Sequence, residues 1–136
     1  MILLLDTAKE ACFIGIWDGL WICQESFTGG RELNKLIIQK LKKVLTEAMT
    51  NDHNNALSGI IVNAGPGSFT GLRIGLSVAN TIAYTEDIPI VGVKNSDDID
   101  KILLKGEALL KSAAPGFSSS IIPYYGAEPN ITSPKI

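Results

Sequence analysis

The residues best suited to chemistry lie in a glycine-rich run that follows an apolar segment at residues 59–62: Gly65-Pro66-Gly67-Ser68-Phe69-Thr70-Gly71-Leu72-Arg73-Ile74-Gly75. The free N–H groups at the start of a helix can hold an anion, and Arg73 in the first turn would assist them. The run lacks the lysine of a P-loop, and its glycine spacing departs from a dinucleotide-binding fingerprint. It therefore predicts either a weak anion site that uses Gly67, Ser68 and Arg73 or a close contact between two backbones.

Local patterns within this run predict how its backbone is held. Pro66-Gly67 is typical of a tight turn in which the glycine supplies a positive φ. Ser68 or Thr70 would cap the helix that follows. Gly71 and Gly75 fall on one face of that helix and leave no side chain there. We therefore expect another segment of the protein to pack very close to that face.

The pair Asp6-Thr7 is a second candidate, because it directly follows the apolar segment at residues 2–5. The pair resembles the acid and hydroxyl that actin-like ATPases place at the end of a first strand for a metal ion and a phosphate; the simpler alternative is a turn after a buried strand. The single histidine, His53, lies among asparagines, so we expect a surface loop residue that forms no catalytic triad and no metal site. No catalytic residue and no metal ligand is predicted. The candidate nucleotide- or anion-binding set is Asp6, Thr7, Gly67, Ser68 and Arg73.

The composition sets limits on the class of protein. The chain has 136 residues, of which 46% are hydrophobic, so it fits one domain with a sizeable core. Its net charge of −2 argues against a protein that binds nucleic acid by itself. The apolar run at residues 2–5 is too short to cross a membrane, and we expect a cytoplasmic protein. The cysteines, Cys12 and Cys23, are expected as buried thiols and not as a disulfide.

Hydrophobic periodicity and turn residues predict the elements that position these groups. In chain order they are a strand, a hairpin, a helix, a strand, a helix and a strand: residues 2–5, 11–17 with 20–27, 32–49, 59–62, 72–84 and 88–93. In the hairpin, a two-residue turn at Asp18-Gly19 would pair Trp17 with Leu20 and place Ile14 opposite Cys23. Beyond residue 94, the pattern predicts two short helices on either side of Gly106, at 97–104 and 107–112, and a candidate strand at 121–125.

Three meandering strands followed by alternating helices and strands predict an α/β fold. Its sheet would be mixed and five-stranded, with three antiparallel strands and then parallel ones, and helices on its faces. This is the layout of a ribonuclease-H-like half-domain, as found in actin-like ATPases. The likeness concerns the fold and implies no activity by itself. We expect this domain over residues 1–95, followed by a short helical remnant and a C-terminal tail over residues 96–136.

Both long helices carry more apolar surface than one sheet can cover. In the first helix, five residues at helical spacing form the stripe expected to face the sheet: Leu33, Ile37, Leu41, Val44 and Ala48. Further apolar residues of the two helices fall outside the sheet-facing positions: Leu36, Ile38, Leu45, Ile74, Val78 and Ile82. A helix that is apolar on more than one side is covered on more than one side. The second cover would be the other helix, another segment or another chain.

The run at residues 65–75 resembles the signature of the bacterial TsaB (YeaZ) family. Leu5-Asp6-Thr7-Ala8 with Ala11-Cys12 resembles the N-terminal strand and turn of that family, and residues 89–93 resemble the strand after the signature helix. The likeness covers about the first 95 residues. Pro123-Tyr124-Tyr125 and the tail to Lys135 resemble the C-terminal end of the family.

The resemblance implies an actin-like ATPase fold with no catalysis of its own. Such proteins pair with TsaD, the subunit that transfers a threonylcarbamoyl group to an adenosine of tRNA, and the ATPase TsaE joins them. ATP and magnesium would then act at the level of the complex, and tRNA would be contacted only indirectly. The pairing surface of the family uses the two helices that match residues 32–49 and 72–84 here. Their six further apolar residues would form it, and they would support a homodimer when the chain is alone.

Two departures from the family pattern bear on function. Family members are usually much longer and carry a second actin-like subdomain, so we expect an internally shortened protein without the two-lobed nucleotide cleft. The entry to the first helix, Gly30-Arg31-Glu32-Leu33, also differs from the pattern of the family. The alternative function is a minimal nucleotide-binding ATPase or phosphotransferase that uses Asp6, Thr7, Ser68 and Arg73.

Overall fold

The computed structural model describes residues 1–50 and 56–126. In chain order its elements are β1 (Ile2–Asp6), β2 (Ala11–Trp17), β3 (Trp21–Thr28), α1 (Leu33–Thr50), β4 (Gly59–Gly65), α2 (Phe69–Glu86), β5 (Ile90–Lys94) and α3 (Ile99–Ser112). A short 3₁₀ turn at Gly30–Glu32 leads into α1. The predictions for His53 and for the tail beyond residue 126 fall outside the described residues.

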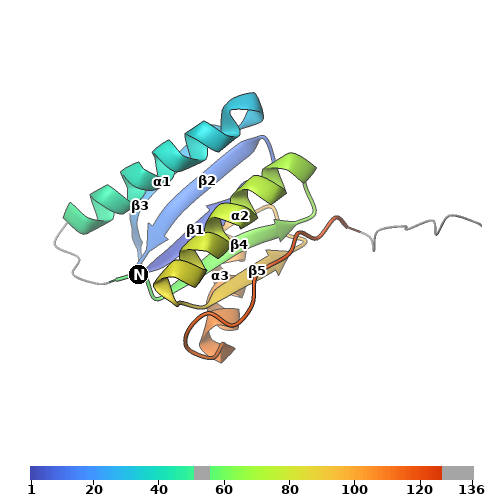
Figure 1. Cartoon of the computed structure of the whole chain (residues 1–136). Coiled ribbons are helices and arrows are strands. Elements are labelled where there is room, and N and C mark those ends of the chain that lie inside the picture. The colour runs from blue at the N-terminus through green and yellow to red at the C-terminus, as the bar shows by residue number, and fades with distance from the viewer. Residues whose placement is uncertain (51–55, 127–136) are drawn as a thin grey trace, which may run out of the picture.

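The five strands form one mixed sheet in the order β3-β2-β1-β4-β5 (Figure 1). The pairs β1–β2 and β2–β3 are antiparallel, whereas β4 lies parallel to both β1 and β5. The predicted sheet of three antiparallel strands followed by parallel ones is therefore confirmed. Pro89 stands immediately before β5, where its missing N–H removes no ladder hydrogen bond from the strand.

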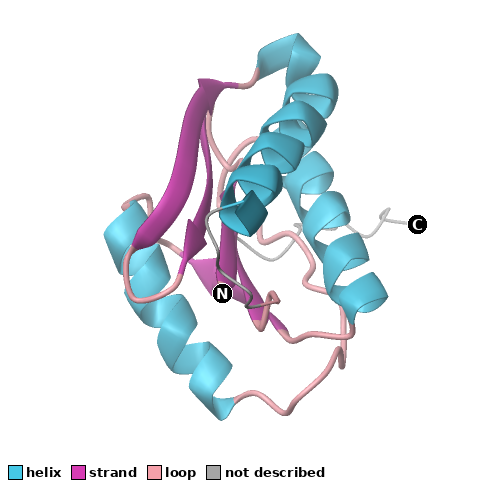
Figure 2. Ribbon diagram, turned by 90° about the vertical axis from the view of Figure 1, so that its left-hand side faces the viewer, coloured by secondary structure: helices cyan, strands magenta, loops and turns pink. Residues whose placement is uncertain are grey.

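Helices cover both faces of the sheet. α1 and α2 lie side by side on one face, and α3 lies on the other (Figures 1 and 2). The larger core lies between the sheet and the α1–α2 pair and includes Leu3 and Ile37, while a smaller core under α3 includes Leu4, Ile61 and Ile102. The stripe predicted for the first helix is confirmed, because all five of its residues are buried: Leu33, Ile37, Leu41, Val44 and Ala48.

The hairpin turn differs from the prediction. Asp18, Gly19 and Leu20 form a three-residue loop, and Trp17 pairs with Trp21 instead of Leu20. The ladder is irregular at this point, so the tryptophans lie on the same side of the sheet as Phe13. The ring of Trp21 makes edge-to-face contacts with Phe13 and Trp17, at centroid distances of 5.2 and 5.1 Å. This aromatic packing accompanies the longer loop.

The rest of the hairpin follows the shifted register. Cys23 lies opposite Ile16 and not opposite Ile14 as predicted. Both Cys12 and Cys23 are free, buried thiols, and the Cys23 thiol donates to the carbonyl oxygen of Val44 in α1 at 3.1 Å. Burial raises the pKa of both thiols above the ordinary value, so each serves as a small packing residue.

A single helix, α3, replaces the two short helices predicted around Gly106. The glycine faces the sheet, and a Cβ atom there would meet the side chain of Ile61 in β4. Gly106 therefore permits close packing of α3 on the sheet and does not break the helix. Asp98 caps the N-terminus of α3 by accepting from the backbone N–H of Asp100 at 2.9 Å.

Residues 113–126, here called the C-terminal strap, leave α3 and cross to the face that carries α2. The strap is extended but forms no β-strand, so the strand predicted at residues 121–125 is wrong. Hydrogen bonds hold it to β4 and α2: the Asn80 amide bonds both backbone groups of Ile121, and the Tyr124 N–H donates to the Ala64 carbonyl at 2.8 Å. The predicted domain boundary at residue 95 stays a prediction.

Candidate functional site

The glycine-rich turn lies between β4 and α2, at the edge of the sheet where β1 also ends (Figure 1). Ser68 is the N-cap of α2, because its Oγ accepts from the backbone N–H of Gly71 at 3.2 Å. The predicted positive φ at Gly67 is wrong, since the left-handed residue is Gly65, with φ of 119°. Gly67 is needed for a different reason: a Cβ there would collide with the backbone of Ala8.

The close packing predicted for Gly71 and Gly75 is confirmed. Both glycines face Thr7 at the end of β1, and the Thr7 hydroxyl donates to the carbonyl oxygen of Gly71 at 2.7 Å. A Cβ atom at Gly75 would overlap the Thr7 hydroxyl oxygen. The glycines therefore bring α2 directly onto the end of β1, and the hydroxyl of Thr7 is used in that contact.

Asp6 is held by internal hydrogen bonds and is only 4% exposed. Its Oδ1 accepts from the backbone N–H of Ala8 at 3.0 Å and from the Asn63 side-chain amide at 3.2 Å. Asn63 also bonds the Ser96 carbonyl and the Gly65 N–H, so it ties the ends of β1, β4 and β5 together. Sequence reasoning missed Asn63, although an amide directly after three apolar residues of a buried strand was the pattern that could have found it.

A cavity of about 400 Å³ opens beside Asp6. Its lining includes Lys9, Cys12 and Asp97, and the Lys9 ammonium pairs with the Asp97 carboxylate at 3.6 Å. Within residues 1–50 and 56–126, no group of three or more His, Cys, Asp or Glu side chains is placed to hold a metal ion. The cavity offers the hydrogen-bonded carboxylate of Asp6 and the ion pair of Lys9 with Asp97, which suits polar contacts more than acid–base chemistry.

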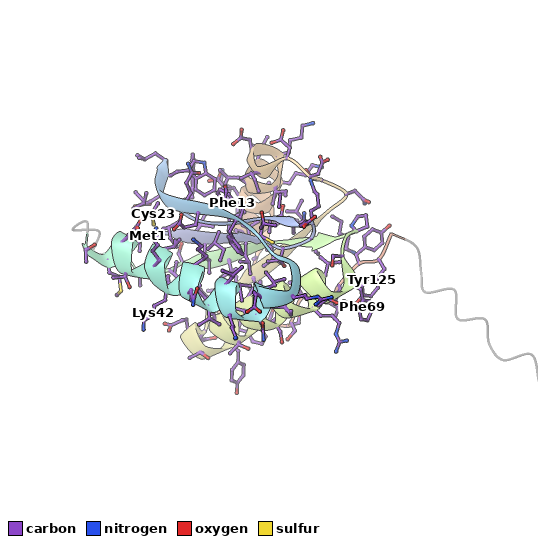
Figure 3. The ribbon with its side chains drawn as sticks, turned by 90° about the horizontal axis from the view of Figure 1, so that it is seen from above. Met1, Phe13, Cys23, Lys42, Phe69 and Tyr125 are labelled. Atoms are coloured by element: carbon purple, nitrogen blue, oxygen red, sulfur yellow. The ribbon has the colours of Figure 1, made fainter. Side chains whose placement is uncertain are left out.

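Arg73 does not join the other members of the predicted anion site. Its guanidinium carbon lies 5.2 Å from the centroid of the Phe69 ring, and Phe69 stacks on Tyr125 of the strap at 5.2 Å (Figure 3). The structure thus brings together Thr7, Gly67 and Ser68 and leaves Arg73 over an aromatic ring. The hydroxyls of Thr7 and Ser68 bond the backbone of Gly71, and Gly67 lies against the backbone of Ala8. Anion binding by this set stays a prediction.

A second candidate surface is the apolar groove between α1 and α2. Ile38 is 53% exposed, and a cavity of about 400 Å³ between the helices is lined by Asn34 and Ile37 of α1 and by Ile74 and Val78 of α2, among others. Met49, which sequence reasoning missed, is 75% exposed one turn after Leu45. The residues of this helical groove are Ile38, Leu45, Met49, Ile74, Val78 and Ile82.

Leu36 lies on the other side of α1. It is one turn before Lys40 and two turns before Lys43, and both lysines pair with Glu25 of β3. Residues at such spacing share one helix side, so Leu36 faces away from the helical groove. The close ion pair with Lys43 holds the pKa of the Glu25 carboxyl below its ordinary value. This side of α1 is therefore held to β3 by ion pairs, whereas the groove side is exposed to solvent.

Comparison with known proteins agrees with this architecture. The family model described as TsaD, tRNA N6-adenosine threonylcarbamoyltransferase, matches residues 28–99. The tRNA threonylcarbamoyladenosine biosynthesis protein TsaB of Escherichia coli (strain K12) is 33% identical over 92 residues, which cover 68% of this chain and 39% of that protein. The chain therefore spans well under half the length of this relative.

Two solved structures share the fold. A Pseudomonas aeruginosa protein, described as similar to peptidase YEAZ, is 26% identical with a TM-score of 0.61, and the match covers 69% of this chain and 43% of that one. YeaZ from Pseudomonas aeruginosa is 24% identical with a TM-score of 0.63, over 79% and 49% of the two chains. These likenesses confirm the predicted half-domain of actin-like type. Within the described part of the chain, no helix has the length and apolar character needed to span a bilayer.

Proposed function

We propose that this chain is a non-catalytic partner subunit in tRNA threonylcarbamoyladenosine synthesis. The chain belongs to the tRNA N6-adenosine threonylcarbamoyltransferase family as one of its TsaB (YeaZ) members. In this role it binds and activates a TsaD-type transferase. A TsaE-type ATPase joins the larger complex, where ATP and magnesium act, and tRNA is contacted through the other subunits.

The helical groove is the observation that carries this proposal. Two helices on one sheet face leave large apolar side chains uncovered along their common side, with Ile38 and Met49 more than half exposed. Exposed apolar side chains gathered along one side of a helix pair mark a protein–protein contact site. The polar groups of the glycine-rich turn, by contrast, are used in internal hydrogen bonds. This distribution supports a binding role more than a catalytic one.

The test is assembly with a TsaD-type protein from the same source, followed by size exclusion and calorimetry. The wild-type chain should run as a homodimer alone and convert to a heterodimer with the transferase. Replacing Ile38→Asp and Val78→Asp together should abolish the homodimer and weaken the heterodimer by at least about 100-fold, because the charges would be buried without partners.

A matched control is Leu104→Asp on α3, which replaces a side chain that is 71% exposed on the opposite face of the sheet. It should leave both assemblies intact. Circular dichroism and urea unfolding check that the groove variant is folded. If the folded groove variant assembled like the wild type, the proposed surface would be wrong.

A second candidate function is nucleotide binding at the cavity beside Asp6. The buried carboxylate at the end of β1 is the observation that favours it. Calorimetric titration with ATP and magnesium separates the two functions. Submillimolar binding that is lost in Asp6→Asn, which keeps an acceptor oxygen but removes the charge, would support the nucleotide-binding function. A titration with no measurable heat of binding would favour the role as a partner subunit over nucleotide binding.

A further inference from the structure

We propose that the partner seated in the helical groove presents carboxylates around an apolar helical strip, and that this charge makes the groove prefer such a partner to a second copy of this chain. The inference rests on the proposed function and adds the chemistry of the partner. It follows from how charge is distributed between the α1–α2 pair and the rest of the chain, and from which charged side chains already have partners.

The groove helices are basic in an acidic chain. α1 and α2 carry five cationic side chains against two acidic ones: Lys35, Lys40, Lys42, Lys43 and Arg73 against Glu47 and Glu86. Their net charge is +3, whereas the whole chain has −2, so the remainder of the chain has −5. A surface with this asymmetry attracts anionic partners and repels surfaces like itself.

Three of these cations already have acidic partners: two on the side of α1 away from the groove and one at the N-terminus of α1. Lys40 and Lys43 pair with Glu25, and Lys35 lies 3.7 Å from Glu32. Glu47 lies one turn after Lys43 and therefore on the same side of α1. These groups therefore contribute little to a partner in the groove.

The other two cations stand beside the groove without an acidic partner among the described residues. Lys42 is exposed, one turn after Ile38 and one turn before Leu45, and it points out from α1 (Figure 3). Arg73 is exposed and lines the groove cavity beside Ile74. One unpaired cation thus stands on each helix that borders the apolar strip.

This arrangement has opposite consequences for the two assemblies. When two copies of the chain meet through the groove, four unpaired cations come together, which disfavours the homodimer most at low salt. Carboxylates of a partner would pair with Lys42 and Arg73 and would speed association, an effect that salt weakens. The homodimer should therefore tighten with added salt, whereas the heterodimer should form more slowly.

The experiment measures both assemblies at about 50 mM and about 500 mM NaCl, concentrations between which the Debye length falls to about 4 Å. The association rate with the TsaD-type protein should fall by about tenfold or more with salt. The homodimer dissociation constant, from sedimentation, should fall over the same range. The double variant Lys42→Gln with Arg73→Gln should lower the association rate with the transferase by about tenfold at low salt. The same variant should lower the dissociation constant of the homodimer, because the repulsion between the cations is removed.

Two controls isolate the charge. Lys101→Gln with Lys105→Gln removes two exposed charges from α3 on the opposite face and should change neither assembly. Lys42→Gln alone leaves the Arg73–Phe69 contact intact. It should lower the heterodimer association rate and the homodimer dissociation constant by smaller factors than the double variant does. If the wild type binds the transferase but salt and the glutamine variants leave its association rate unchanged, this inference fails and the partner role stands. If the wild type binds no transferase at either salt concentration, both fail.

Discussion

The two faces of α2 use opposite means of contact. On the inner face, Gly71 and Gly75 have no side chain, and the backbone of the helix lies on Thr7. On the outer face, Ile74, Val78 and Ile82 are only partly buried. The inner face is fully covered within one chain, because Thr7 packs against both glycines and its hydroxyl bonds the Gly71 carbonyl. The outer face keeps part of its apolar surface exposed to solvent, and this difference favours it as the surface that binds a partner.

The largest expected effect lies on the inner face. Gly75→Val would place a branched side chain where the Thr7 hydroxyl now lies, and we expect a loss of unfolding free energy above about 3 kcal/mol, measured by urea denaturation. Ser77→Val, on the exposed side of the same helix, should change the unfolding free energy by no more than about 0.5 kcal/mol. If Gly75→Val does not fold, Gly75→Ala should still show a loss of at least about 1 kcal/mol. Equal stability of the two valine variants would contradict the filled inner face.

A pair of truncations compares the two faces directly. Leu76 is 3% exposed in the core, and Leu76→Ala should lower the unfolding free energy by about 3 kcal/mol because it leaves a cavity. Ile74→Ala, on the groove side, should lower it by only about 1 kcal/mol, since the isoleucine is partly exposed in the monomer. The measurement is urea unfolding of monomeric protein at low concentration. Similar losses for both variants would mean that the groove is as well covered as the core.

A smaller effect is expected where the strap crosses α2. The Asn80 amide bonds the backbone N–H and carbonyl of Ile121, at 2.8 and 2.9 Å. Asn80→Ala should therefore lower the unfolding free energy by about 1–2 kcal/mol. Hydrogen exchange of the Ile121 amide should also become faster, while Ser77→Ala leaves it unchanged. Unchanged protection of that amide in Asn80→Ala would show that the strap is held by its other contacts.

The smallest effect concerns the side of α1 that is fastened to β3. The pKa of Glu25 is lowered by Lys43, so the pair stabilises the fold above the unfolded-state pKa of a glutamate, about 4.3, and this contribution is lost as the pH falls through the lowered folded-state pKa. Glu25→Gln should therefore be less stable than the wild type at pH 7, and the difference should vanish in acid. Thermal unfolding across this range is the measurement, with Glu32→Gln as the exposed control. A difference that grew in acid would contradict the pairing.

Patterns that depend on neighbours along the chain were predicted well. The five buried residues of α1 and the close contact at Gly71 and Gly75 follow from helical spacing and from the absence of a side chain. The helix cap was predicted at Ser68 or Thr70, and the structure has it at Ser68. The hairpin loop was predicted one residue too short, because the packing of Trp21 on Phe13 accompanies a longer turn. Gly106 predicts a helix break that the structure does not have, because the contact with Ile61 that it permits involves a strand far away in the sequence.

Over residues 1–94 the sequence by itself determined which segments form helices and strands, their order, and which face of each long helix is apolar, since these depend on residue type and on periods of two or 3.6 residues. Only the tertiary structure decided which apolar residues remain uncovered. Leu36 and Ile38 look equivalent along the chain, yet β3 lies beside one and the helical groove beside the other. Exposure is a property of what packs nearby in space, and strand order and the path of the strap set those neighbours over distances that no local pattern spans.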